Sequence, residues 1–388
     1  MKESITFYTG ALEDAVKNAI LFIGSKKTID ILGDIRFEIH GDSASIYATD
    51  LSAIFKQDIQ LARGSEENIV FQVEGKIFHA LISKRTAEKI LVNINDVGIT
   101  IVVGRDSYKM PTSNVDDFPE LDPGDDFVNV GASLENGDFK QMVLSCSSFA
   151  SDDELRPQIC GINLNQNKNK KMSFVSTDGR SICICDTDYH CAAKLDVNIP
   201  HKPFVAFCKC IDKDTLSKVD LFVSKNRSWI KAVIDNTTLM IRLIDGKFPN
   251  YEEVIPEKFD HLAKVSKIQV ETFKRLTVCS DSTHAVTLSI SGSKSKNLNL
   301  KSFSLDAGMM ASENIDLDEE SDNSIERVSI SSDYLATIVG LINGPMEIKT
   351  IGNTKIVSIK PISETDSKLN SIGYYVMPMM ISDMETEE

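Results

Sequence analysis

The spacing of apolar residues along the chain predicts six helices. In each segment the apolar side chains recur every three or four residues, so they fall on one face of an α-helix. The six segments are 12–23, 77–82, 139–149, 204–211, 270–276 and 334–342. The last segment follows Ser331, a residue type that commonly caps the start of a helix.

Between these segments the period falls to two, which predicts β-strands. Apolar and polar residues alternate at 35–39, 239–243 and 286–290, as they do in half-buried strands. Gly41 and Asp42 follow the first of these strands and predict a turn there. Helices and strands therefore alternate along the whole chain, which is typical of an α+β fold.

Short motifs recur at intervals of one third of the chain. Ala-Thr-Asp ends one strand-like run at Asp50, and Ser-Thr-Asp ends another at Asp178. Phe-Pro at 118–119 is matched by Phe-Pro at 248–249. Each interval is about 130 residues, an ordinary domain size. Because the two aspartates occupy equivalent points of a repeat, we interpret them as turn caps rather than as catalytic carboxylates.

The repeat predicts three similar domains. Turn-forming and charged residues cluster at 123–124 and 256–258, where domain boundaries are expected. We therefore place the domains at 1–124, 125–257 and 258–388, the last ending in a short acidic tail.

Charge restricts the possible functions. The chain carries 42 Lys and Arg against 57 Asp and Glu, for a net charge of −15. This balance argues against a wholly basic nucleic-acid-binding surface but allows a local basic face. The sequence contains no evident secretion signal and no apolar run long enough to span a membrane, so we expect a cytoplasmic protein with free thiols.

The common enzyme motifs are absent from the sequence. It has no phosphate-binding glycine loop, no dinucleotide-binding glycine triplet and no His-Glu-x-x-His. It also lacks the Gly-x-Ser-x-Gly nucleophile motif. We therefore expect a protein without enzymatic activity and without a cofactor or metal.

Cysteine and histidine gather in the middle of the chain. They stand at Cys183, Cys185, His190, Cys191, His201, Cys208 and Cys210. A zinc-dependent hydrolase is one alternative function, but structural zinc sites usually use wider ligand pairs than the Cys-x-Cys pairs seen here. We instead expect Cys183 and Cys185 to fill one face of a core strand. Cys208 and Cys210 are expected on a helix. Free cysteine is commonly a small buried hydrophobe, which favours a structural role for these residues over a zinc site.

Five segments occur in the order and spacing of one known family. They are ILGD (31–34) with ATDL (48–51), DFPEL (117–121), STDGR (176–180), DGKFPNYEEVIP (245–256) and YYVMPM (374–379). Together they closely resemble the bacterial sliding clamps, the beta subunits of DNA polymerase III. The resemblance covers nearly the whole chain.

This resemblance implies a DNA-clamp fold of class α+β, with three tandem similar domains that each place two helices on an antiparallel sheet layer. A head-to-tail homodimer would close into a six-domain ring around duplex DNA, which it holds without reading its sequence. The implied function is a non-catalytic processivity factor. Its partners would be the replicative polymerase, a clamp loader and other proteins with a clamp-binding motif, and no membrane. A scaffold that binds peptides but not DNA is a second alternative.

The resemblance also implies a pocket for client peptides between the second and third domains. Its matching residues are Ile159, Thr177, Gly179, Ile182, Pro249, Val254, Tyr375, Val376, Met377, Pro378 and Met379. Ile159 and Ile182 could equally be core residues. Glu252, Glu253 and Met380 depart from basic residues of the family, so we expect a more acidic rim and an altered peptide preference.

The basic residues in or beside the helices are the candidates for facing DNA. They are Lys17, Lys76, Lys84, Arg85, Lys140, Lys202, Lys209, Lys213, Lys274 and Arg275. Lys26 and Lys27 occupy a loop where the family typically has an arginine, whereas Asp153 would repel phosphate from another loop. For any single residue, an ordinary solvated helix face is the alternative.

The resemblance places the dimer seam at two ends of the chain. The matching positions are Tyr108, on an edge strand of the first domain, and Val278 with Cys279 in the third. Edge strands present unpaired backbone groups that another chain can pair with, and a closed ring satisfies both ends at once.

Overall fold

The computed structural model describes residues 3–24, 29–95, 97–192, 194–212, 215–290, 296–318, 321, 325, 327–352, 354–362 and 367–380. Two compact units make up the chain. Unit 1 comprises Met1–Lys140 and Ile199–Ile244, and unit 2 comprises Gln141–Asn198 and Asp245–Glu388.

Unit 1 is built on an 11-stranded antiparallel sheet in the order β6-β5-β4-β1-β3-β15-β14-β13-β7, with β2 paired to β3 and β8 paired to β13. Its strands are β1 (Glu3–Tyr8), β2 (Asp34–Thr49), β3 (Ala53–Glu74), β4 (Lys89–Asn95), β5 (Gly98–Val103), β6 (Asp106–Met110), β7 (Phe127–Asn129), β8 (Leu134–Glu135), β13 (Lys218–Ser224), β14 (Trp229–Ile234) and β15 (Thr237–Arg242).

Unit 2 contains an eight-stranded sheet in the order β12-β9-β10-β11-β23-β22-β21-β16 and a four-stranded sheet in the order β19-β18-β17-β20. Its strands are β9 (Gly161–Gln166), β10 (Lys171–Thr177), β11 (Ser181–His190), β12 (Asp196–Pro200), β16 (His261–Val265), β17 (Ala285–Ser289), β18 (Asn297–Ser304), β19 (Met309–Asp316), β20 (Val328–Ser331), β21 (Met346–Thr350), β22 (Val357–Pro361) and β23 (Leu369–Val376).

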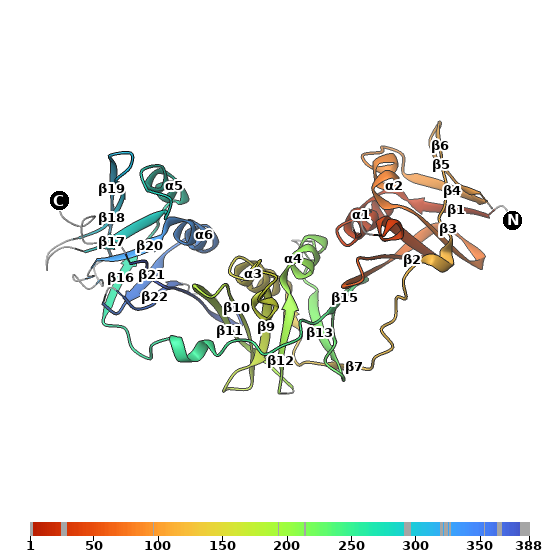
Figure 1. Cartoon of the computed structure of the whole chain (residues 1–388). Helices are drawn as coiled ribbons and strands as arrows, with labels where there is room; N and C mark the ends of the chain where they lie inside the picture. The colour runs from red at the N-terminus through yellow and green to blue at the C-terminus, as the bar shows by residue number, and fades with distance from the viewer. Residues whose placement is uncertain are drawn as a thin grey trace. The chain divides into compact units, whose positions relative to one another are not determined.

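All six predicted helices are confirmed. They are α1 (Thr9–Ala19), α2 (Gly75–Ile82), α3 (Asn136–Ser147), α4 (His201–Cys210), α5 (Val270–Val278) and α6 (Ser332–Ile342). Ser331 caps α6 as predicted, because its hydroxyl accepts a hydrogen bond from the Asp333 amide at 3.3 Å. The first helix ends four residues before the predicted limit of 23, because Ile20 forms its C-cap. In each unit the helices lie over one face of the sheets (Figure 1).

The order of elements repeats three times. The central module runs β8, α3, β9 to β12, α4, β13 to β15, and the last runs β16, α5, β17 to β20, α6, β21 to β23. The first module has the same order, except that the long strands β2 and β3 take the place of four shorter ones. Three similar modules with two helices each are therefore present, and the predicted α+β fold class is confirmed.

Strand pairing joins the modules to one another. In unit 1, β15 pairs with β3, and in unit 2, β11 pairs with β23. These pairs cross the predicted domain limits, so the central module is divided between the two units. The limits 1–124, 125–257 and 258–388 therefore stay a prediction.

The predicted turn at Gly41 and Asp42 is wrong. Strand β2 continues through both residues, and its register with β3 shifts on either side of Gly41. Gly41 has a φ of 57°, a left-handed conformation that is typical of β-bulges. A Cβ on Gly64 in β3 would lie 1.7 Å from the Gly41 carbonyl oxygen. The glycine pair thus allows the two backbones to approach closely within a continuous hairpin.

Candidate functional site

The turn between β10 and β11 forms the centre of the candidate site. The Thr177 hydroxyl donates to the Ser181 carbonyl at 2.6 Å and accepts from the Gly179 amide at 3.0 Å. One carboxylate oxygen of Asp178 accepts from the amides of Arg180 at 2.8 Å and Ser181 at 2.7 Å. The predicted role of Asp178 as a turn cap is therefore confirmed. Gly179 has a φ of 91°, which only glycine adopts without strain.

The end of β23 lies beside this turn. Val376 pairs with Ser181 and Tyr375 pairs with Ile182 across the two strands. After the strand ends, the Met377 amide donates to the Arg180 carbonyl at 2.9 Å, and the Met379 amide donates to the Ser329 carbonyl at 2.7 Å. Backbone hydrogen bonds therefore hold Met377 against the turn and Met379 against β20.

A buried apolar cluster lies under these residues. Ile182 and Tyr375 pack with the buried side chains of Val175, Ile184, Phe248 and Ile356. The partly buried side chains of Tyr251, Ile255 and Phe259 pack against the same cluster. This contact attaches the segment 245–256, which includes Pro249 and the short helix η4 (Tyr251–Val254), to the strands of the site.

Some apolar side chains of the site remain open to solvent. Val254 is 52% exposed and Met377 is 45% exposed, whereas Pro378 and Met379 are half-buried. Exposed apolar residues that adjoin a buried cluster are typical of a binding surface. Val376, Ile159 and Ile182 are buried, so they support this surface from below.

The loop before β9 forms another border. Ile159 ends the short helix η3 (Pro157–Ile159), and its carbonyl accepts from the Ser151 amide at 3.0 Å. In the same loop, Arg156 Nη1 lies 3.1 Å from the position that a Cβ on Gly179 would occupy. Gln158 Cβ lies 3.7 Å from the position that a Cβ on Gly246 would occupy, which is ordinary van der Waals contact. The structure thus gathers the residues predicted to bind peptide, and their binding role stays a prediction.

The acidic side chains at the rim of the site have polar or basic partners. Glu252 forms an ion pair with Lys168 at 2.9 Å, and Glu253 accepts from the Asn250 side chain at 2.6 Å. Asp153, which was expected to repel phosphate, is paired with Arg156 at 2.8 Å. This hydrogen bond lowers the pKa of the Asp153 carboxyl. The excess acidity expected from the sequence is therefore partly balanced by neighbouring cations.

Several residues of the site were not found from the sequence. Ile184 could have been found, because it follows Ile182 at the strand period of two. Arg156, Ile356 and Tyr334 carry no local signal. The Tyr334 hydroxyl, on α6, donates to the second carboxylate oxygen of Asp178 at 2.6 Å. Such a contact between residues far apart in the chain is visible only in the folded protein.

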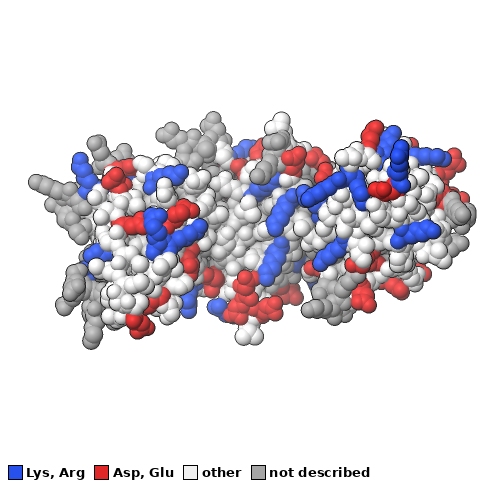
Figure 2. Space-filling model, turned by 90° about the horizontal axis from the view of Figure 1, so that it is seen from above, with Lys and Arg blue, Asp and Glu red and all other residues white. Residues whose placement is uncertain are grey.

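The described basic residues lie on or just after the helices, as predicted. Several of them are engaged: Arg275 binds both carboxylate oxygens of Glu313 at 2.7 and 2.8 Å. Lys140 donates to the Ile211 carbonyl at 2.8 Å. Lys17 and Lys209 line a polar cavity of about 550 Å³ in unit 1. Figure 2 shows Lys and Arg side chains on the face seen from above, with acidic side chains beside them.

The other predicted DNA-facing residues have various positions. Lys76 lies on α2, Lys202 on α4, and Lys274 on α5, where it is 3.7 Å from Glu271. Lys84 and Arg85 follow the end of α2. Lys26, Lys27 and Lys213 lie outside the described residues, as does the acidic tail.

The predicted seam residues lie at a sheet edge and at a helix end. Tyr108 is on β6, the outermost strand of its sheet, and its hydroxyl accepts from Arg85 at 2.9 Å. Val278 ends α5 and is 71% exposed, and Cys279 is the C-cap of that helix. The role of these residues in a dimer seam stays a prediction.

Two remaining predictions concern membrane-spanning helices and groups of side chains that could bind a metal ion. No helix within the described ranges is long and apolar enough to cross a membrane. Among the same residues, one group could hold a metal ion, and it consists of Cys146, Cys183 and Cys185. The predicted placements of Cys183 and Cys185 on a strand, and of Cys208 and Cys210 on a helix, are confirmed.

Comparison with protein families identifies the chain. Residues 4–122 match the family model of the DNA polymerase III beta subunit N-terminal domain, and residues 133–250 match that of its central domain. The chain belongs to the DNA polymerase III beta subunit family. The resemblance noted in the sequence is thereby confirmed.

The individual relatives are distant in sequence, but their matches extend over most of the chain. The beta sliding clamp of Salmonella typhimurium is 21% identical over 362 residues, which cover 92% of this chain and 94% of that protein. The clamp of Pseudomonas putida is 22% identical over 264 residues, covering 66% and 69% respectively.

Solved structures share the fold over almost the full length. The DNA polymerase III beta subunit of Thermotoga maritima has a TM-score of 0.86 at 20% identity and covers 98% of this chain and 100% of that one. A sliding clamp of Pseudomonas aeruginosa, solved bound to griselimycin, has a TM-score of 0.86 at 19% identity and covers 97% and 99%.

Proposed function

We propose that this beta subunit is a DNA sliding clamp that closes as a head-to-tail homodimer around duplex DNA. The observation that carries the proposal is the threefold repeat of a two-helix module in a chain that belongs to the beta subunit family. Beta subunits of this family are non-catalytic processivity factors. We extend this to the present chain, which would make and break no covalent bond itself.

The distribution of charge supports a topological hold on DNA. The net charge is −15, and cations such as Arg275 and Lys140 are engaged within the protein. A surface that bound phosphates tightly would need many uncompensated cations. A closed ring needs only weak contacts that do not read the bases, and these permit sliding.

Free sheet edges support ring closure. Strand β6 ends one sheet and β19 ends another. The ion pair between Arg275 on α5 and Glu313 on β19 holds this helix beside the edge strand. Val278, at the end of α5, therefore lies in the same module as the free edge of β19. Pairing of the β6 end of one chain with the β19 end of another would be heterologous, and two such contacts close a ring.

The clamp would tether its clients through the apolar surface around Val254 and Met377. An adaptable methionine and exposed valine beside a rigid strand end suit a short linear peptide. The clients would be the replicative polymerase, the clamp loader and other proteins with a clamp-binding motif. Tethering keeps the local concentration of polymerase high. We place this activity in the cytoplasm, on duplex DNA of any sequence.

Retention on DNA tests the ring. After loading, the protein should stay on circular duplex DNA and slide off linear DNA of the same sequence. Val278→Asp should give monomers by ultracentrifugation and lose retention, because the charge would be buried at the seam. Val97→Asp is the matched control, since Val97 is 83% exposed and lies outside the predicted seam. Equal retention on linear and circular DNA, or a dimeric Val278→Asp variant, would contradict the proposal.

Peptide affinity tests the client site. A labelled clamp-binding peptide should bind Val254→Ala and Met377→Ala about tenfold more weakly than the parent protein, since each loss removes buried apolar area in the complex. Val97→Ala should bind normally. Deletion of 382–388 separately tests whether the acidic tail tunes peptide entry. Undiminished binding by both site variants would reject the site.

A further inference from the structure

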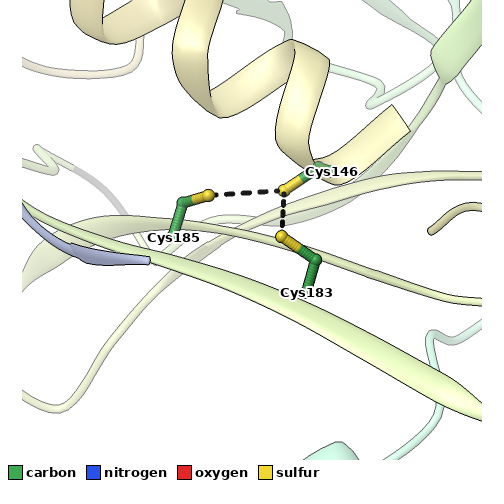
Figure 3. Close-up of side chains that lie close together, drawn as sticks. All are labelled: Cys146, Cys183 and Cys185. Carbon is green, nitrogen blue, oxygen red and sulfur yellow. Dashed lines mark hydrogen bonds between the residues drawn. The ribbon is translucent and has the colours of Figure 1, made fainter. Parts of the chain in front are cut away.

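Three cysteine sulfurs meet in the interior of unit 2 (Figure 3). Cys146 projects from α3, and Cys183 and Cys185 project from β11. The sulfur of Cys146 lies 3.9 Å from that of Cys183 and 3.7 Å from that of Cys185. All three sulfurs lie within 4.8 Å of one another, and all three side chains are fully buried. The strand period of two puts Cys183 and Cys185 on the same face.

A buried hydroxyl lies on the same face of the sheet. Ser176 on β10 is the register partner of Cys183, and directly paired residues of neighbouring strands share a face. Its side chain is fully buried, and its oxygen has no hydrogen-bond partner apart from an interaction with the Cys146 thiol. Buried polar atoms without partners are rare in native proteins and call for an explanation.

We propose that Cys146, Cys183 and Cys185 form a binding site for one divalent thiophilic ion of the zinc and cadmium class, with the Ser176 oxygen as a fourth donor. Thiolate ligands select such soft ions. Two sulfurs bound to a tetrahedral zinc at about 2.3 Å lie about 3.8 Å apart. The sulfur–sulfur distances from Cys146 to Cys183 and to Cys185, 3.9 and 3.7 Å, match this spacing, so an ion would enter with little rearrangement.

The chemistry of binding favours a divalent ion over a monovalent one. Each thiol must give up its proton to solvent when it becomes a ligand. Three thiolates with a divalent ion leave one negative charge in the interior, whereas a monovalent ion leaves two, and buried charge is costly. The ion would tie α3 to β11, whose other face carries Ile182 and Ile184 of the apolar cluster. This role is structural and independent of DNA or peptide binding.

Metal uptake by the full chain tests the site. The protein is kept in a non-thiol reductant and titrated with Cd(II), and thiolate-to-cadmium charge-transfer absorption is recorded. One ion per chain is expected, with elemental analysis giving the same stoichiometry for Zn(II). Cys146→Ala should lose this uptake. Cys208→Ala should keep it, because Cys208 is likewise a buried helical cysteine but lies outside the cluster. Uptake that Cys146→Ala leaves intact, or no uptake by the parent protein, would overturn the proposal.

Two further measurements test the site without Cys146→Ala, in case that variant folds poorly. Zn(II) should raise the melting temperature of the parent protein and of Cys208→Ala, because an ion that binds only the native state stabilises it. X-ray absorption of the zinc-loaded parent protein should show three sulfur neighbours at about 2.3 Å. A zinc environment of nitrogen and oxygen alone would place the ion elsewhere and reject the assignment.

Discussion

Two turns of the molecule have the same hydrogen bonds but different surroundings. In the first module, Asp50 accepts from the amides of Ser52 at 2.9 Å and Ala53 at 2.8 Å. In the central module, Asp178 accepts from the equivalent amides of Arg180 and Ser181. A threonine before each aspartate also closes each turn in the same way. The repeat therefore conserves the chemistry of the turn rather than only its sequence.

The two turns differ at the residue after the aspartate. Leu51 has a φ of 77° and Gly179 a φ of 91°, so both positions need a left-handed backbone. Leu51 is half exposed, whereas Arg156 closes off the space where a Cβ on Gly179 would lie. Asp178 also accepts from Tyr334 on α6, and Asp50 has no such bond among the described residues. The central turn has thus gained neighbours on two sides at the point where the candidate site forms.

Removing the two aspartates should give unequal losses of stability. Asp178→Ala loses bonds to two amides, the Ser181 hydroxyl and Tyr334, and should lower the free energy of unfolding by about 2–3 kcal/mol. Asp50→Ala loses only the bonds within its turn and should cost about 1–2 kcal/mol. Denaturant unfolding of both variants measures the difference. Equal losses would mean that the Tyr334 contact adds nothing.

Exchanging the residues after the aspartates should have unequal consequences. Gly179→Leu puts a side chain into a left-handed position against Arg156, which should cost about 1–2 kcal/mol. It should also weaken binding of a clamp-binding peptide, since the turn lies at the centre of the candidate site. Thermal unfolding and peptide titration check the two effects.

Leu51→Gly is the reciprocal variant and the matched control. It relieves left-handed strain but adds freedom to the unfolded chain, so the net change should stay within about 0.5 kcal/mol. Peptide affinity should not change. A loss of affinity in Leu51→Gly equal to that in Gly179→Leu would show that the turns are not distinguished by their surroundings.

The same contrast shows what sequence can and cannot predict. Local periodicity found all six helices, and the repeated Thr-Asp pair identified two turn caps, because both signals lie within a few residues. The bulge at Gly41 was mistaken for a turn, since glycine serves both and the pairing partner decides. The contacts of Tyr334 with Asp178, of Arg156 with Gly179, and of Cys146 with Cys183 join distant segments. These contacts result from tertiary packing, and no local sequence pattern predicts them.

Tyr334→Phe isolates the contact that separates the two turns. It removes one hydrogen bond to a carboxylate that is partly open to solvent, so it should cost about 1 kcal/mol. In a double-mutant cycle with Asp178→Ala, the two losses should be less than additive, because they share this bond. Chemical denaturation of the four proteins measures the coupling. Full additivity would show that the hydrogen bond between Tyr334 and Asp178 does not contribute to the stability of the central turn.

The contact with Asp178 should also change the alkaline behaviour of the protein. Burial, and then the hydrogen bond to Asp178, raise the pKa of Tyr334 to about 12. The native state therefore holds this proton when the unfolded chain has lost it. The resulting stability is fully present below about pH 10 and is lost as pH rises toward the native pKa. After allowance for solvent screening, we expect about 1 kcal/mol of extra alkaline loss in the parent protein relative to Tyr334→Phe.

Phenolate absorption of the native protein checks this value directly. The chain has 8 tyrosines, so the difference between the titration curves of the parent protein and Tyr334→Phe isolates one phenol. That phenol should ionise at higher pH than a free tyrosine, because burial and then the hydrogen bond to the Asp178 carboxylate disfavour the phenolate. In Asp178→Asn the neutral amide still accepts the hydrogen bond but no longer repels a phenolate, so ionisation should move back toward the usual range. An unchanged curve in Asp178→Asn would assign the shift to burial alone, and the charge of Asp178 would then have no part in it.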